Sequence, residues 1–200
     1  MLAVDARALL REALEEAVAV LRGGGLVAFP TESFYGLGAD ALNPQALTRV
    51  FSVKGRPESK PLLVLVASPA MAETLVSEIG DGPRALMARH WPGPLTLVLR
   101  AAPGVPSALT AGTGTVGLRM PGHPIALDLV RAAGFPVTAP SANPAGQAAP
   151  TTARMVREYF EGGGIDLVLD GGPTAGGPPS TVADCTVWPP RVLRQGPVSV

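Results

Sequence analysis

Three cations lie within one short stretch of this chain, Lys54-Gly55-Arg56-Pro57-Glu58-Ser59-Lys60. This density is unusual because only 16% of all residues are charged. The pattern predicts a helix that ends just before the stretch and an apolar strand, residues 62–66, just after it. Ligands of α/β proteins usually bind to loops at the ends of strands. We therefore predict that this loop binds the phosphates of a nucleotide.

Two more arginines, Arg119 and Arg194, are expected at strand ends, where neutral hydrogen-bonding side chains also occur: Ser33, Thr115, Ser141, Asn143 and Ser180. No nucleophile–base pair is evident. A site rich in cations and poor in bases suits phosphoryl or nucleotidyl transfer, in which the protein positions groups and neutralises charge. Arginine also binds carboxylates through two parallel hydrogen bonds, so one cation could orient an amino-acid substrate.

Less specific interpretations remain open for the same residues. An arginine on an edge strand, as we expect for Arg119, is usually just solvated. The hydroxyl-rich stretch 30–38, predicted as a loop, and the stretch 139–146 could be ordinary turns whose side chains bind their own backbone. The two histidines, His90 and His123, are expected at helix ends, and with a single cysteine they form no zinc ligand set.

Hydrophobic periodicity and capping residues predict the elements that position these groups. Helices are expected over residues 5–22 (capped by Asp5), 43–53, 68–79, 83–90, 123–133 and 151–160 (capped by Thr151). Strands are expected over residues 26–29, 62–66, 95–99, 115–119, 135–138, 165–169, from 180 onward and 191–194. The alternation predicts an α/β fold with one central mixed sheet, antiparallel where the late strands lack an intervening helix. The glycine-rich stretch 171–179 is a candidate lid.

Composition limits the class of protein. A single domain is expected over residues 1–200, because no linker is long enough to divide the chain. Formal net charge is zero, which argues against a general polyanion binder. The single cysteine, Cys185, is predicted to be inert inside a strand, and without a signal peptide the chain is interpreted as cytoplasmic. No apolar run approaches the roughly 20 residues of a membrane span.

Five motifs in order make a specific resemblance. They are PTESFYGLG (30–38), KGRP with KPL (54–62), WPGPLT (91–96), GLRMP (117–121) and PSANPAG (140–146), and PSTV (179–182) and LRQG (193–196) extend them. The chain resembles the YrdC/Sua5 family of L-threonylcarbamoyladenylate synthases, in the short form without an extra C-terminal domain. The resemblance implies a YrdC-like twisted mixed sheet flanked by helices, with a concave basic groove.

The resemblance also implies a reaction, in which L-threonine, bicarbonate and ATP yield threonylcarbamoyl-AMP and pyrophosphate. The product would be passed to tRNA threonylcarbamoyl-transferase proteins for N6-threonylcarbamoylation of adenosine 37 in tRNAs that read ANN codons. The motifs assign Lys54 and Arg56, the expected catalytic residues, and Lys60 to the ATP phosphates with Mg²⁺. They assign Thr115, Ser141, Asn143 and Arg194 to the nucleotide, and Ser33, Arg119 and Ser180 to L-threonine.

Two departures from the family pattern stand out. Ser33 replaces a frequent threonine and keeps its hydroxyl. Leu65 stands where many members have a histidine, which bears on how the amino acid is bound. Two alternatives to the synthase are a double-stranded RNA- or tRNA-binding protein of the same fold, and a paralogue with a different acceptor. The low aromatic content, 4%, offers little for base stacking.

Overall fold

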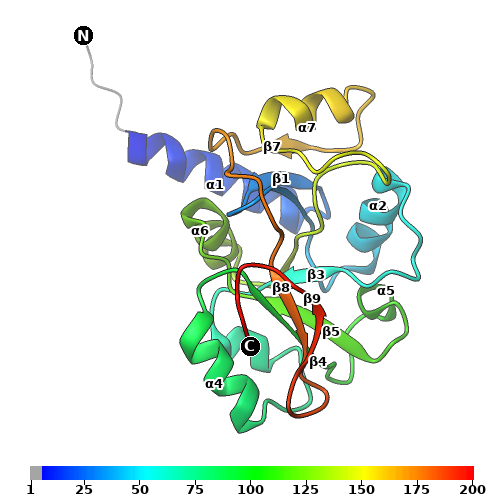
Figure 1. Cartoon of the computed structure of the whole chain (residues 1–200). Helices are drawn as coiled ribbons and strands as arrows, with labels where there is room; N and C mark the ends of the chain where they lie inside the picture. Colours follow the sequence, from blue (N-terminus) through cyan, green and yellow to red (C-terminus); the bar gives the residue numbers. More distant parts are fainter. Residues whose placement is uncertain (1–5) are drawn as a thin grey trace.

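The computed structural model describes residues 6–200, which form seven helices and nine strands (Figure 1). The helices are α1 (Ala6–Arg22), α2 (Pro44–Lys54), α3 (Pro69–Glu73), α4 (Asp81–His90), α5 (Ser107–Thr110), α6 (Pro124–Ala133) and α7 (Ala153–Tyr159). The strands are β1 (Val27–Pro30), β2 (Tyr35–Gly38), β3 (Leu63–Leu65), β4 (Leu95–Arg100), β5 (Thr115–Arg119), β6 (Val137–Thr138), β7 (Leu167–Val168), β8 (Thr181–Asp184) and β9 (Arg191–Arg194). The α/β class is therefore confirmed.

The larger sheet has six strands in the order β6-β3-β5-β4-β8-β9. It is mixed, as predicted: β3 pairs with β5 and β4 with β8 in parallel, whereas β4–β5, β3–β6 and β8–β9 are antiparallel. β5 lies in the interior of this sheet, so the expectation that Arg119 sits on an edge strand is wrong. A polar side chain on a central strand must find partners within the protein.

A second sheet of three strands, β2-β1-β7, was not predicted. Residues 35–38 of the stretch predicted as a loop form β2, which pairs with β1 in a hairpin. Glycine at position 38 permits this packing, because a Cβ there would lie 2.8 Å from the Phe29 ring. The two sheets meet where Leu37 N donates to Pro140 O and Thr138 N donates to Ala39 O, at 2.7 and 2.9 Å.

Local patterns predicted the helices well, with two exceptions. Asn43 caps α2 and Pro44 begins it, as expected. The helix predicted over 68–79 ends at Glu73, because the following residues pair with the end of β4 through Val76 and Ala101. The cap of α7 is Thr152 rather than Thr151. Asp5, the predicted cap of α1, lies outside the described residues.

Cys185 follows β8 instead of lying inside it. The side chain is partly buried, and burial together with Asp184 raises the pKa of the thiol to about 11. A protonated thiol is a poor nucleophile, which agrees with the inert role predicted for it.

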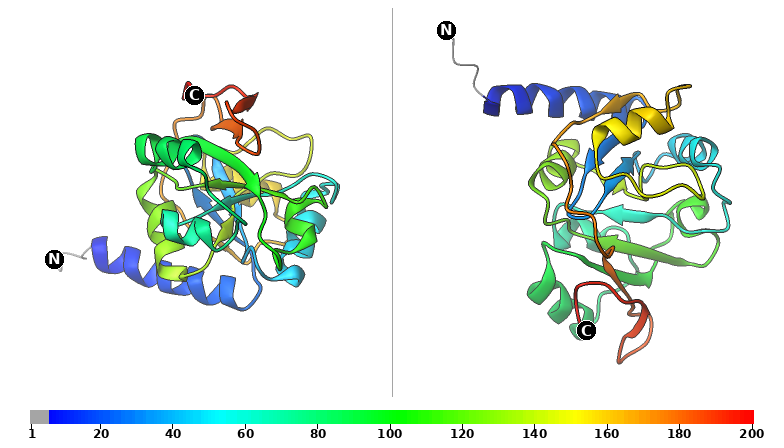
Figure 2. Two further views of the ribbon diagram at one scale, coloured as in Figure 1. Left: turned by 90° about the horizontal axis from the view of Figure 1, so that it is seen from below. Right: turned by 45° about the horizontal axis from the view of Figure 1, so that its top comes forward.

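Helices cover the two sheets from several sides (Figure 2). α1 and α6 pack together beside β1, and α7 packs near β7 at the far end of the smaller sheet (Figure 1). One apolar cluster lies around β4, β5 and α2, and the other lies between α1, α6 and β1. No helix within residues 6–200 is long and apolar enough to cross a membrane.

Candidate functional site

A pocket of about 420 Å³ lies between the two sheets. Its floor is one face of the larger sheet, where alternate residues of β5 project: Thr115, Gly117 and Arg119. This alternation follows from the two-residue period of a strand. The opposite wall consists of residues 31 and 33–36 with residues 139–141, and Arg56 and Pro61 lie at the other end. Seven predicted site residues line the pocket: Ser33, Arg56, Thr115, Arg119, Ser141, Ser180 and Arg194.

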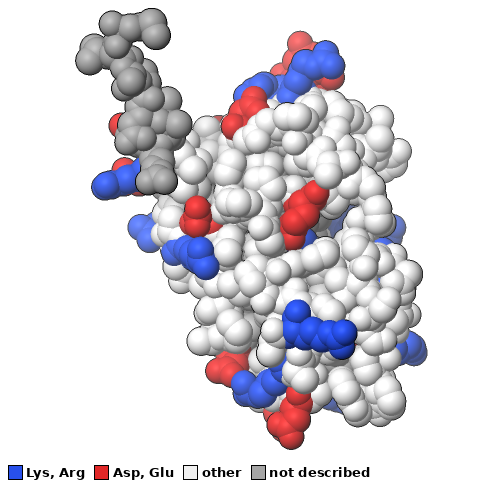
Figure 3. Space-filling model, turned by 60° about the vertical axis from the view of Figure 1, so that its left-hand side comes forward, with Lys and Arg blue, Asp and Glu red and all other residues white. Residues whose placement is uncertain are grey.

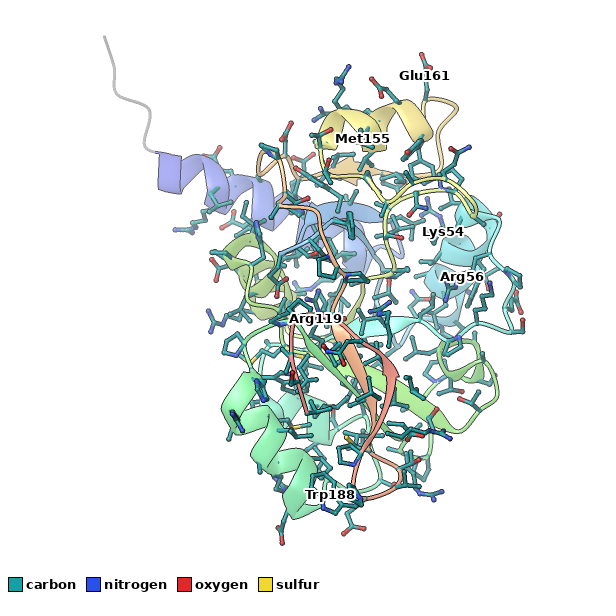
Figure 4. All side chains as sticks on the ribbon, in the orientation of Figure 1. Lys54, Arg56, Arg119, Met155, Glu161 and Trp188 are labelled. Atoms are coloured by element: carbon teal, nitrogen blue, oxygen red, sulfur yellow. The ribbon has the colours of Figure 1, made fainter. Side chains whose placement is uncertain are left out.

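Arg119 marks the buried end of the pocket, near the centre of the molecule in Figure 4. Its side chain is 6% exposed, and Nη1 donates to Glu32 Oε2 at 3.1 Å. Nε is buried and has no hydrogen-bond partner among the described residues. Burial lowers the pKa of the guanidinium while Glu32 opposes this shift, and arginine stays charged in proteins. A buried cation with an unused donor suits an incoming anion.

The strand beside Arg119 is apolar at this level. Leu65 of β3 pairs in register with Arg119 and is fully buried. Leu65 therefore offers no polar contact to a ligand, whereas Arg119 provides a charged donor at this end of the pocket. This position is the one at which the family resemblance leads us to expect a histidine in many members.

Three polar side chains form a chain of hydrogen bonds along the sheet. Thr96 Oγ1 and Ser180 Oγ are 2.9 Å apart, and Arg194 donates from Nη2 to Ser180 Oγ at 3.1 Å and from Nε to Ser180 O at 3.0 Å. Burial and the charge of Arg119 lower the pKa of Arg194, so the two guanidiniums feel each other electrostatically. Arg119 and Arg194 thus line the same pocket.

The opposite end of the pocket is more open. Arg56 follows α2, and its side chain bonds to its own loop, with Nη2 donating to Pro61 O at 3.1 Å. Figure 4 places Arg56 and Lys54 near the end of α2, on the same side of the molecule. Lys60 is exposed on this loop and does not line the pocket.

Lys54 has a different environment from its neighbours. It is 4% exposed, and Nζ donates to the carbonyl oxygens of Ser141 and Asn143, the latter at 2.6 Å. Its own carbonyl accepts from Ala145 N at 2.6 Å. The ammonium of Lys54 therefore binds the backbone of the 141–145 loop. Lys54 does not line the pocket. Burial, with a smaller contribution from Arg56, lowers its pKa to about 8.

Asn143, whose carbonyl oxygen accepts from Lys54 Nζ, does not line the pocket either. Nδ2 donates to Gln147 O at 2.8 Å and to Pro144 O at 3.1 Å. Oδ1 is buried without a partner among residues 6–200. Ser141, by contrast, lines the pocket. The structure therefore brings Lys54, Ser141 and Asn143 together, but only Ser141 lines the pocket, and Lys54 and Asn143 support the loop that carries it.

The glycine-rich segment proposed as a lid contacts the Ser33 loop. Thr174 Oγ1 donates to Ser33 O at 2.8 Å, and Gly176 N donates to the same oxygen at 2.9 Å. Tyr35 donates from its hydroxyl to Gly172 O at 2.7 Å. These contacts hold residues 172–176 against the wall that carries Ser33.

Sequence reasoning assigned no role to two polar residues of this site. Glu32, which contacts Arg119, was visible as the one carboxylate in a stretch rich in hydroxyls. Thr96, which contacts Ser180, was visible as the polar residue of an otherwise apolar strand, Leu-Thr-Leu-Val-Leu. Neither signal indicated a partner, because both partners are more than 80 residues away.

Metal-ligating side chains do not gather in the described part of the chain, where no group of three or more His, Cys, Asp or Glu residues could hold an ion. His90 ends α4 and His123 precedes α6, as predicted. Burial lowers the pKa of His123.

Comparisons with known proteins identify the family and its relatives. The model of the Sua5/YciO/YrdC family, described as "Telomere recombination", matches residues 19–196. The threonylcarbamoyl-AMP synthases of Pyrococcus abyssi (strain GE5 / Orsay) and Bacillus subtilis (strain 168) are 48% and 44% identical over 94% and 93% of this chain. The crystal structure of P. abyssi Sua5 complexed with L-threonine matches 90% of the chain with a TM-score of 0.87.

The chain spans about half the length of these relatives, 56% and 54% of the two synthases and 53% of the Sua5 structure. A shorter protein, the putative threonylcarbamoyl-AMP synthase of Mycobacterium tuberculosis (strain H37Rv), is 43% identical and is covered over 83% of its length.

Proposed function

Because the chain belongs to the Sua5/YciO/YrdC family, we propose that it is an L-threonylcarbamoyladenylate synthase. It would convert L-threonine, bicarbonate and ATP into threonylcarbamoyl-AMP and pyrophosphate. The observation that carries this proposal is the pocket itself, which has a buried arginine with an unused donor at one end and a cationic loop at the other. An amino-acid carboxylate suits the first and nucleotide phosphates suit the second.

The pocket suggests how the substrates are distributed. Arg119 binds the threonine carboxylate, and the hydroxyls of Ser33 and Ser180 hold the rest of the amino acid. Arg56 and Lys60 bind the phosphates, while Thr115, Ser141 and Arg194 contact the nucleotide. We propose that Lys54 and Asn143 act on the nucleotide through the loop they support, since reaching a phosphate directly would require Lys54 to leave two carbonyls.

The mechanism rests on positioning and charge neutralisation. The threonine amine and bicarbonate form a carbamate, in which a C–N bond replaces a C–O bond and water is released, and a carbamate oxygen then attacks the α-phosphorus in line. A bond forms between this oxygen and phosphorus as the bond to the pyrophosphate oxygen breaks. Holding the two substrates in one pocket removes much of the entropic barrier, and Arg56 and Arg194 offset the negative charge that develops.

Mg²⁺ is expected to enter with ATP. The described residues offer no carboxylate cage for it, so we propose that the phosphates are its main ligands. The ion would supply further neutralisation of the pyrophosphate leaving group. The protein's contribution at this end is the cationic loop around Arg56.

The wider setting follows from the same proposal. The product would pass to tRNA threonylcarbamoyl-transferase proteins, which implies a cytoplasmic location and makes contact with tRNA possible. We propose that residues 1–200 act as a single YrdC-like domain, a view supported by the family match over 19–196. A double-stranded RNA-binding role is less well supported, because the formal net charge is zero and few aromatic side chains are available for stacking; on the one face shown in Figure 3, basic and acidic side chains lie interspersed.

The test is pyrophosphate release by the pure protein with ATP and Mg²⁺. Release that requires both L-threonine and bicarbonate, and that L-serine does not support equally, is expected. Release without either substrate, or none under any condition, would contradict the synthase activity. RNA affinity that survives physiological salt would then favour the binding protein, and failure to complement a strain lacking the tRNA modification would favour the paralogue.

A further inference from the structure

Glu32 joins the two walls of the pocket. It follows β1 on the smaller sheet, and its carboxylate reaches the larger sheet and the segment after β5. Oε2 accepts from Arg119 Nη1 at 3.1 Å, and Oε1 accepts from Gly122 N at 2.7 Å. Glu32 itself does not line the pocket, although Thr31 and Ser33 on either side of it do.

These contacts fix one nitrogen of the Arg119 guanidinium. The carboxylate is anchored by a backbone amide, so it forms a rigid support rather than a mobile counter-ion. Nη1 is occupied by this support, whereas Nε is buried and unpartnered within the described residues. Leaving such a donor unpaired in the protein interior is unfavourable. An incoming carboxylate would recover this cost without having to reorient the arginine.

Glu32 also balances charge where two cations meet. Arg119 and Arg194 both line the pocket, and the charge of Arg119 contributes to the lowered pKa of Arg194. The Glu32 side chain is only 26% exposed, so water screens its charge less than at a surface. The carboxylate therefore offsets the charge of Arg119 and holds its side chain in place.

We propose that Glu32 is a positioning residue, which holds Arg119 so that the pocket selects an α-amino acid carboxylate. This inference rests on the proposed function and deepens it. Glu32 does not act on the reacting atoms, because it does not line the pocket and its two carboxylate oxygens accept hydrogen bonds from Arg119 and Gly122.

The proposal differs measurably from two other roles. A general base acting on the threonine amine would make kcat fall steeply in Glu32→Gln with little change in the threonine KM. If Glu32 formed a purely structural ion pair, its loss would lower the melting temperature and leave the ratio of the threonine KM to the ATP KM unchanged. A positioning residue instead raises the threonine KM and Kd selectively, and the isosteric amide restores part of the loss.

The experiment compares Glu32→Ala, Glu32→Gln and Glu73→Gln with the unmodified protein. Glu73→Gln is the matched control, because it alters an exposed ion pair with Arg84 at 2.6 Å, away from the pocket. Threonine affinity is measured by calorimetry without ATP. Threonine KM, ATP KM, kcat and melting temperature are measured alongside.

We expect Glu32→Ala to weaken threonine binding about 10- to 100-fold, as for a lost partner of a buried charge pair, while ATP KM changes less than about 3-fold. Glu32→Gln should recover part of the affinity, because the amide keeps one of the two acceptor oxygens, and Glu73→Gln should match the unmodified protein. Unchanged threonine affinity in Glu32→Ala, or a loss confined to kcat, would overturn the inference. An unmodified protein that binds no threonine would overturn the proposed function itself, and is recognised without any variant.

Discussion

The two ends of the pocket differ in how they hold their cations. At the buried end, Arg119 is 6% exposed and is fixed by Glu32, which is itself tied to a backbone amide. At the open end, Arg56 donates to the carbonyl oxygens of Lys60 and Pro61 in its own loop, and Lys60 is exposed. The buried end is preorganised for a small anion of one shape. The open end, where we propose that the ATP phosphates bind, is held less rigidly.

This difference has a physical consequence for binding. A buried charge–carboxylate contact is strong because little water screens it, whereas exposed cations are screened by salt. Amino-acid recognition should therefore be selective and insensitive to salt. Phosphate binding should rely on the sum of several cations and should weaken as salt is added. The predictions below test that contrast.

The largest effect is expected at Arg56. Arg56 is the cation of the 54–60 loop that lines the pocket, and Arg56→Ala removes it. We expect kcat/KM for ATP to fall about 10²–10³-fold, as when one preorganised donor to a developing anion is lost. Arg89→Ala, an exposed change on α4, serves as the control. Pyrophosphate release at varied ATP measures the effect, and near-normal turnover would remove Arg56 from the phosphate site.

Arg119→Ala should separate the two substrates. Its loss removes a charge-assisted hydrogen bond, so we expect the threonine KM to rise about 10- to 100-fold while the ATP KM changes little. Steady-state kinetics at saturating levels of the other substrate provide the comparison. Equal increases in both KM values would show that the buried end is not reserved for the amino acid.

Lys54→Met tests the proposal that Lys54 acts on the nucleotide through the 141–145 loop that it supports. The substitution keeps the apolar stem but leaves the carbonyls of Ser141 and Asn143 without their donor. We expect the free energy of unfolding to fall by about 2–3 kcal/mol and turnover to fall with it. Denaturant unfolding and turnover are measured on the same protein. If the variant has normal stability but no turnover, the proposal that Lys54 acts through the loop is contradicted, and a direct contact between Lys54 and a phosphate is favoured.

Lys60→Ala should have a smaller effect that depends on salt. The residue is exposed, so we expect the ATP KM to rise about 3-fold at low ionic strength and to converge with the unmodified value above about 0.5 M salt. Titrating NaCl in the ATP assay measures this. A salt-independent defect would mean that Lys60 is buried in the nucleotide complex.

The last prediction concerns the pH dependence of stability. Folding lowers the pKa of Lys54 from 10.5 to about 8, so the folded state binds fewer protons than the unfolded state between these values. The free energy of unfolding should therefore increase as pH rises through this window. Lys54→Met should lack this increase, and subtracting its unfolding curves from those of the unmodified protein isolates it. No difference in slope would contradict the lowered pKa.

Local sequence determined much of this molecule. Asn43 and Pro44 specified the start of α2, residues 115–119 were recognised as a strand, and the motifs placed the cationic loop between a helix and a strand. Caps, prolines and hydrophobic periods act between neighbours in the chain, which is why they can be read without a structure.

Tertiary structure decided the roles within the site. Glu32 meets Arg119 across 87 positions, and Lys54 meets Ser141 across the same separation. The second sheet, and the interior position of β5, were equally invisible in the sequence. These features depend on strand order and register, which arise from the packing of distant segments. The sequence thus specified which groups are available, and only the fold determined which of them face the pocket and which support it.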